Sequence, residues 1–167
     1  MSIEFSKRAA SIAALFVLLG LTLMSFLSWS RVALARGPVY ELRIERASGG
    51  SVILQVELAA TDAEKAKGLM FRTKLGDGEG MLFPYGRSQE ITMWMRNTYI
   101  SLDMIFIRAD GIIHRIEART EPLSDRVISS NGDVFAVLEV AGGGAERHGI
   151  KPGDRVIHPA LPAGPER

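Results

Sequence analysis

Short runs in which apolar and polar residues alternate with a period of two recur along the chain after residue 38. The first two, residues 39–46 and 51–58, flank Gly49-Gly50, which predicts a β-hairpin because successive side chains of a strand point to opposite faces. The same criteria predict further strands at residues 90–97, 102–107, 134–140 and 155–158.

Helical patterns are few and short. Thr61-Asp62-Ala63-Glu64 has the hydroxyl and the glutamate of a capping box, and Lys67-Gly68 supplies the cation and the glycine that end a helix. One further helical turn is expected at residues 145–148. Many short strands with turn residues between them predict a mainly β (α+β) single domain, a small antiparallel barrel or sandwich with one or two short helices.

The first 35 residues follow a different pattern. Lys7 and Arg8 precede the apolar run 9–27, and Ala33-Leu34-Ala35 follows it. This order is typical of a secretory signal peptide cleaved after Ala35, but the run is also long enough to stay uncleaved as an inner-membrane anchor. Because the two cations favour a cytoplasmic amino terminus, either outcome predicts an exported domain, periplasmic or otherwise extracytoplasmic.

The chain is therefore expected to have three parts: a leader over residues 1–35, a β-rich domain over 36–158, and a frayed proline-rich tail over 159–167. The composition, 47% hydrophobic and 23% charged, is that of a globular domain. A formal net charge of +1 argues against a nucleic-acid partner. The absence of cysteine excludes disulfides, thiolate metal sites and a cysteine nucleophile, and no cofactor is expected.

The densest polar and aromatic chemistry lies in residues 92–103, and the candidate pocket residues there are Trp94, Asn97, Thr98 and Asp103. Two interpretations stay open. In one, the indole packs in the core and the polar side chains fix a turn through bonds to the backbone. In the other, the four side chains line a pocket in which the indole stacks on a ligand and the polar groups orient it.

Arg96, His114 and Glu139 are secondary candidates. Glu139 is the least expected, because it interrupts an apolar strand, and such a residue is expected to face solvent or to pair with an arginine such as Arg155. An acid and base pair of Asp103 and His114 would suit a small hydrolase if adjacent strands align them.

The thioethers suggest a further alternative. Five methionines lie between residues 70 and 104, and thioether sulfur is a soft ligand suited to Cu(I). A copper-handling protein would use Met93 and Met95, with the indole of Trp94 facing the ion. Methionine at strand spacing is, however, more often core filling.

Several ordered blocks resemble the DUF192 family of uncharacterised, often exported proteins: Gly68–Arg72, Gly80–Phe83, Met93–Thr98, Leu102–Ile107, Val137–Val140 and Gly149–Asp154. The chain departs from the family pattern at Arg96, where lysine is usual, and at Ser101, where proline is usual. The resemblance implies a compact β-rich domain and carries no established activity. We therefore expect an exported binding or accessory module of the cell envelope, with a small molecule or an envelope protein as its partner.

Overall fold

A computed structural model describes residues 37–163 of the protein. The predicted leader and residues 164–167 of the predicted tail lie outside the described residues. Between residues 37 and 163, no helix is long and apolar enough to span a membrane. The elements are β1 (Val39–Glu45), β2 (Ser51–Leu58), α2 (Asp62–Lys67), β3 (Glu79–Met93), β4 (Leu102–Ile107), β5 (Ile113–Glu117), β6 (Ile128–Ala141), α3 (Gly144–Arg147) and β7 (Arg155–Ile157).

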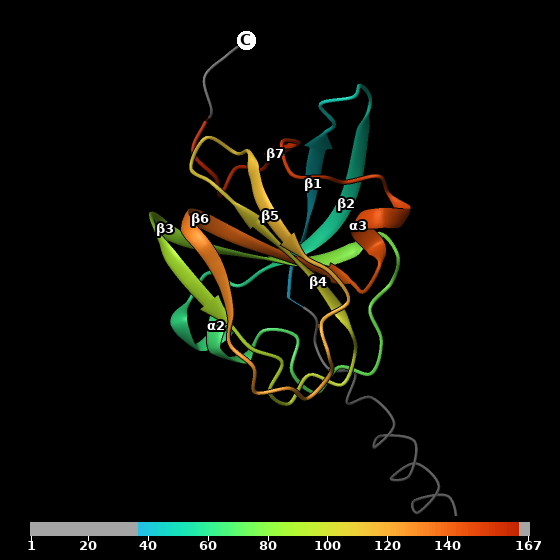
Figure 1. The fold of residues 1–167 in the computed structure, drawn as a ribbon, viewed down its shortest axis with the longest axis vertical. Helices are drawn as coiled ribbons and strands as arrows, with labels where there is room; N and C mark the ends of the chain where they lie inside the picture. The colour runs from blue at the N-terminus through green and yellow to red at the C-terminus, as the bar shows by residue number, and fades with distance from the viewer. Residues whose placement is uncertain (1–36, 164–167) are drawn as a thin grey trace, which may run out of the picture. The chain divides into compact units, whose positions relative to one another are not determined.

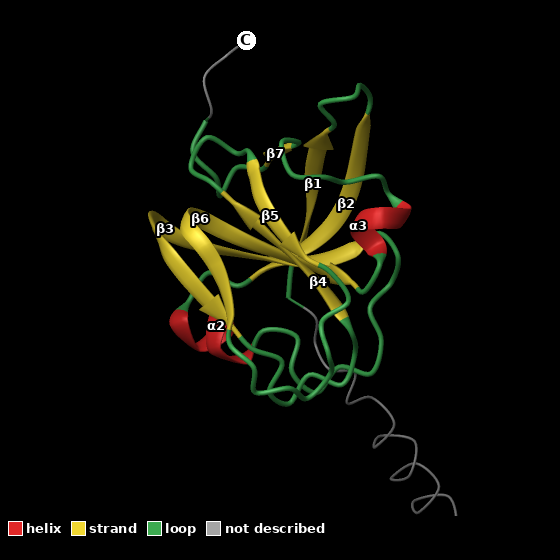
Figure 2. Ribbon diagram, viewed as in Figure 1, coloured by secondary structure: helices red, strands yellow, loops and turns green. Residues whose placement is uncertain are grey.

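The strands form one curled sheet in the order β5-β4-β6-β3-β2-β1-β7 (Figures 1 and 2). The predicted mainly β domain with short helices is confirmed. One neighbouring pair, β2 and β3, is parallel rather than antiparallel. The connection between these two strands contains α2 and is long enough for the crossover that parallel pairing requires.

The two ends of the sheet meet at one short segment. Ile112 of the β4–β5 turn forms an isolated bridge with Arg155 of β7. The amide of Ile113 donates to the carbonyl of Asp154 at 2.9 Å, and the amide of Val156 donates to the carbonyl of Gly111 at 2.8 Å. These hydrogen bonds protect strand edges that would otherwise be open.

Two hydrophobic clusters cover opposite faces of the central strands. Leu138 of β6 belongs to one, with Leu42, Leu54 and Ile105, whereas its neighbour Val137 belongs to the other. The second cluster includes Leu69, Met81, Phe83, Met95, Met104 and Phe106. Because side chains alternate along a strand, Glu139 is directed to the same face as Val137, toward the second cluster.

Helix α2 has the predicted capping box. The hydroxyl of Thr61 accepts a hydrogen bond from the amide of Glu64 at 3.2 Å, and the carboxylate of Glu64 accepts one from the amide of Thr61 at 2.8 Å. Gly68 ends the helix with φ at 46°, a conformation that glycine tolerates. The last turn of α2 therefore lies in a defined position beside β3.

Several predicted boundaries differ from the structure. Strand β3 begins at Glu79 rather than at residue 90, and β6 begins at Ile128 rather than at residue 134. The strand expected at residues 90–97 ends at Met93, because the amide of Met95 turns to the carbonyl of Ser124 at 3.1 Å and Asn97 has φ at 57°. In the predicted tail, Leu161 packs against the first cluster and is 7% exposed.

Candidate functional site

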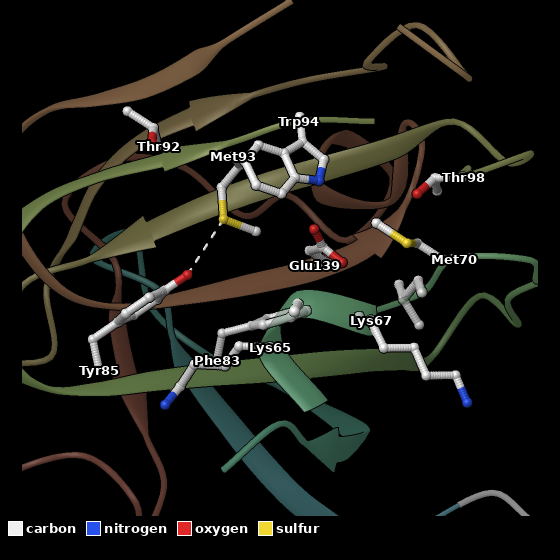
Figure 3. Close-up of a pocket in the computed structure, with 13 residues that line it drawn as sticks. Lys65, Lys67, Met70, Phe83, Tyr85, Thr92, Met93, Trp94, Thr98 and Glu139 are labelled. Atoms are coloured by element: carbon white, nitrogen blue, oxygen red, sulfur yellow. Dashed lines mark hydrogen bonds between the residues drawn. The ribbon is translucent and has the colours of Figure 1, made fainter. Parts of the chain in front are cut away.

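A pocket of about 200 Å³ opens beside the second cluster, where the end of α2, strand β3, the loop after β3 and strand β6 come together. Figure 3 shows the side chains around it. Its lining includes Lys65, Lys67, Met70, Phe83, Tyr85, Thr92, Met93, Trp94, Thr98 and Glu139. The pocket is thus mainly aromatic and thioether in character, with hydroxyls, two lysines and a single acid.

Glu139 lies at the centre of this group in Figure 3. Its position in the register is opposite Met81 of β3 and Met104 of β4, and it is only 4% exposed. Its carboxyl group makes no hydrogen bond or ion pair with any residue between 37 and 163. Burial alone raises the pKa of Glu139 to about 8, since a charged carboxylate is poorly solvated in this position.

The aromatic walls are held in place by specific contacts. The hydroxyl of Tyr85 donates to the sulfur of Met93 at 3.5 Å. Burial, and secondarily the negative charge of Glu139, raises the pKa of Tyr85 to about 12, so this phenol stays neutral at physiological pH. Phe83 is 1% exposed and packs so closely on Gly68 that a Cβ there would lie 3.2 Å from the ring. Trp94 is 48% exposed at the mouth.

The two lysines of the lining do not neutralise Glu139. The ammonium of Lys65 donates to the carbonyl of Ala60 at 3.0 Å and lies 5.5 Å from the centre of the Tyr85 ring. Lys67 is exposed, and Figure 3 shows its ammonium pointing away from Glu139. Neither ammonium contributes to the pKa shift of Glu139.

Of the four predicted pocket residues, the structure brings Trp94 and Thr98 to the pocket. The hydroxyl of Thr98 donates to the carbonyl of Arg96 at 3.4 Å, so Thr98 also stabilises the turn. Asn97 does not line the pocket. Its side-chain amide nitrogen lies 4.0 Å from the sulfur of Met70, which does line the pocket.

Asp103 lies on the opposite face of the sheet from the pocket, because the adjacent residue Met104 is the one paired with Glu139. It is fully buried, and its carboxylate accepts hydrogen bonds from three backbone amides: Arg119 at 2.7 Å, Gly143 at 2.8 Å and Ala145 at 2.9 Å. These contacts fit the turn-fixing interpretation of Asp103.

The proposed partner of Asp103, His114, is not brought to it. Met104 pairs with Glu117, whereas His114 lies near the bulge at Phe106 and Ile107, roughly 10 Å further along β5 than Glu117. The ring of His114 lies 3.3 Å from the carbonyl of Asn131.

The remaining candidates have other contacts. Arg96 forms an exposed ion pair with Asp125 at 2.7 Å, and its guanidinium lies 5.8 Å from the centre of the Trp94 ring. Arg155, the expected partner of Glu139, donates instead to the carbonyl of Asp110 at 2.7 Å. The expectation that Glu139 faces solvent or pairs with this arginine was therefore wrong.

The two methionines of the copper alternative are separated. Met93 lines the pocket, whereas Met95 is fully buried and its sulfur accepts a hydrogen bond from the hydroxyl of Thr120 at 3.1 Å. The pocket contains a different thioether pair, Met70 and Met93. Within residues 37–163, no group of three or more His, Cys, Asp or Glu residues is arranged to hold a metal ion.

A larger hollow of about 700 Å³ lies beside β7 and the residues that follow it. The smaller pocket contains the unpaired acid, which makes it the candidate site.

Sequence reasoning did not identify Phe83, Tyr85 and Met70 as pocket residues, and it placed Glu139 among the secondary candidates. The available signal was the acid within the apolar strand 134–140. A carboxyl group in such a strand must reach solvent, find a hydrogen-bond partner as Asp103 does, or line a cavity, because burying it without a partner is costly.

Comparisons with known proteins agree with the fold. The model of the DUF192 family, described as "Uncharacterized ACR", matches residues 43–158. A crystal structure of a candidate transcription regulator from Sinorhizobium meliloti 1021 is 38% identical, with a TM-score of 0.73 over 76% of this chain and 98% of that one. A protein of unknown function from Novosphingobium aromaticivorans DSM 12444 is 43% identical, with a TM-score of 0.71 over 75% of this chain and 89% of that one. No curated protein matches the chain.

Proposed function

Since the chain belongs to the DUF192 family, whose description gives no activity, we propose a function from its own pocket. The domain is a binding module that holds a small ligand between Trp94, Thr98 and Glu139. The leader-like pattern of residues 1–35 supports placing this module in the cell envelope, as an exported or membrane-anchored protein.

The observation that carries the proposal is the carboxyl group of Glu139, buried and unpaired at the wall of a cavity. Buried polar groups in folded proteins are nearly always hydrogen-bonded, and leaving one unpaired costs free energy. A strongly perturbed carboxyl in a largely apolar pocket is typical of a binding or active site. A ligand with a complementary group would supply the missing partner.

The composition of the lining favours binding over hydrolysis. A hydrolytic site needs a nucleophile next to a base, or two carboxylates across a cleft. The titratable groups of the lining are Glu139, Tyr85 and the two lysines, and the phenol of Tyr85 is held neutral. The separation of Asp103 from His114 removes the acid and base pair considered from the sequence.

A ligand screen with two readouts tests the proposal. The full-length chain carries Trp29→Phe, which leaves Trp94 as the only indole, and is screened against sugars, amino acids, amines, short peptides and metal ions including Cu(I). A ligand at about 100 times its dissociation constant stabilises the protein by roughly 2.7 kcal/mol, which raises the melting temperature measurably. A pocket ligand also changes the emission of Trp94.

The matched variants are Glu139→Gln and Glu121→Gln, because Glu121 is an exposed acid outside the pocket lining. A pocket ligand stabilises the Glu121→Gln protein like the parent and stabilises the Glu139→Gln protein less. The proposal fails if no compound binds, or if every binder acts equally on both variants and leaves the emission of Trp94 unchanged.

A further inference from the structure

Building on the proposed binding function, we infer that the pocket selects small organic cations, with an alkylammonium group held between the Glu139 carboxylate and the surrounding aromatic rings. The acid, the walls and the size of the pocket each favour this ligand class.

The carboxylate of Glu139, once ionised, is complementary to a cation. Glu139 is its only acid and has no cationic partner between residues 37 and 163. The two lysines of the lining do not pair with Glu139. Lys65 donates a hydrogen bond to the Ala60 carbonyl, and Lys67 is exposed. A buried carboxylate gains most from a ligand that brings both a positive charge and hydrogen-bond donors.

The walls suit the same ligand class. Phe83, Tyr85 and Trp94 contribute aromatic rings, and ring faces attract ammonium groups more strongly when water is excluded. Two of these rings already lie near a protein cation, Tyr85 at 5.5 Å from the Lys65 ammonium and Trp94 at 5.8 Å from the Arg96 guanidinium. Met70 and Met93 add polarisable thioethers that adapt to alkyl groups. An anionic ligand is disfavoured, because it would lie beside the carboxyl group of Glu139 in an apolar surrounding.

The size of the pocket limits the ligand. A volume of about 200 Å³ corresponds to roughly seven water-sized groups, taking about 30 Å³ for each. An alkylammonium of about five non-hydrogen atoms therefore fits, and a large polyamine would extend through the mouth beside Trp94.

Binding of a cation is coupled to release of a proton. In the ligand-free protein at neutral pH the carboxyl of Glu139 is mostly protonated, since burial raises its pKa to about 8. Besides Glu139, the titratable groups of the lining are Tyr85 from β3, which stays neutral, and Lys65 and Lys67 from α2. Met104 of β4 lies opposite Glu139 in the register. When an alkylammonium enters, the Glu139 O–H bond breaks, its proton goes to solvent and the carboxylate pairs with the ammonium.

The test is a calorimetric titration of the full-length chain with butylammonium chloride, 1-butanol and sodium pentanoate, three probes of similar size and different charge. At pH 8.5 we expect butylammonium to bind at least tenfold more tightly than either other probe. Its affinity falls by about tenfold per pH unit below pH 8, because the proton must be displaced. About one proton is released per ligand bound at pH 7, measured with a pH electrode in unbuffered salt solution.

Glu139→Gln is expected to lower the butylammonium affinity at least tenfold at pH 8.5 and to abolish proton release, whereas Glu121→Gln leaves both unchanged. The cation class is overturned if 1-butanol or pentanoate binds as tightly as butylammonium, or if butylammonium does not bind while another member of the screen does. In both cases the pocket remains a binding site. If neither butylammonium nor any member of the screen binds, the proposed function fails as well.

Discussion

The Asp103 carboxylate accepts a hydrogen bond from the backbone amide of Gly143 at 2.8 Å, across 40 positions of sequence. Its second oxygen accepts from the amide of Ala145, in the first turn of α3. The carboxylate thereby fixes the glycine-rich segment after β6. Since the pocket lies on the other face of the sheet, Asp103 and Glu139 have separable roles: Asp103 holds a loop, and Glu139 faces the pocket.

Asp103→Asn is therefore expected to reduce stability and to leave ligand binding intact. The amide presents one acceptor oxygen instead of two and turns an NH2 group toward backbone donors, which costs about 3 kcal/mol in unfolding free energy. Urea unfolding measures the loss. Asp133→Asn, at an exposed position, is the control and changes the unfolding free energy by less than about 0.5 kcal/mol. A loss at Asp103 no larger than the control's would contradict its structural role.

The ion pair of Glu57 and Arg72 supports the segment that carries Met70 to the pocket. Two parallel hydrogen bonds of 2.6 Å join the carboxylate and the guanidinium, and both side chains are largely buried. Arg72→Lys cannot make both bonds, so we expect a loss of about 2 kcal/mol in denaturant unfolding. For comparison, Asp125→Asn breaks the exposed pair with Arg96 and costs at most about 0.5 kcal/mol. Equal losses of unfolding free energy in the two variants would show that the buried pair stabilises the protein no more than the exposed pair does.

Gly68 sets the distance between the end of α2 and the pocket wall. Its φ of 46° disfavours any residue with a side chain, and an added Cβ would lie 3.2 Å from the ring of Phe83. Gly68→Ala is expected to destabilise by about 2 kcal/mol in thermal unfolding and to shift the emission of Trp94. Gly78→Ala is the matched control, because Gly78 has no positive φ and a Cβ there meets nothing within 4 Å. A Gly68→Ala protein as stable as this control would show that the close packing is unimportant.

The dependence of stability on pH reports on Glu139. Its pKa is raised from an ordinary value of 4.5 to about 8 in the folded protein, so its stabilising contribution is complete below pH 4.5 and is lost as the pH rises through 8. Glu139→Gln removes this dependence. The variant and the parent are expected to have similar unfolding free energies at pH 4.5, and the variant to be more stable by roughly 4 kcal/mol at pH 8. Parallel curves from pH 4.5 to 8 would mean that the carboxyl is not desolvated.

Local patterns in the sequence predicted much of the fold. The alternation at residues 39–46 and 51–58 gave the β1–β2 hairpin, and Thr61 with Glu64 gave the start of α2. The parallel pairing of β2 with β3 was not predictable in this way, because it depends on where the chain returns after α2. Strand β3 was also missed over its first half, since the glycines before Gly80 and the proline at 84 resemble a turn.

The candidate site was predicted only in part, because local sequence patterns do not show which distant strands lie side by side. Trp94 and Thr98 were found by residue type, because exposed aromatics and hydroxyls near a turn are common in pockets. The importance of Glu139 depends on its neighbours in the sheet, Met81 and Met104, which are 58 and 35 positions away in sequence and which only the topology identifies. Asp103 was misplaced because its face of β4 follows from the register and not from its residue type.

The most direct test of the central claim is a titration of the Glu139 side-chain carboxyl by carbon-13 nuclear magnetic resonance, in the glutamate-labelled full-length chain without added ligand. The Glu139→Gln spectrum assigns the signal. A buried, unpaired carboxyl in the pocket predicts a midpoint near pH 8. A midpoint near 4.5 would show that the group is solvated or paired, and would contradict the account of the pocket on which the proposed function rests.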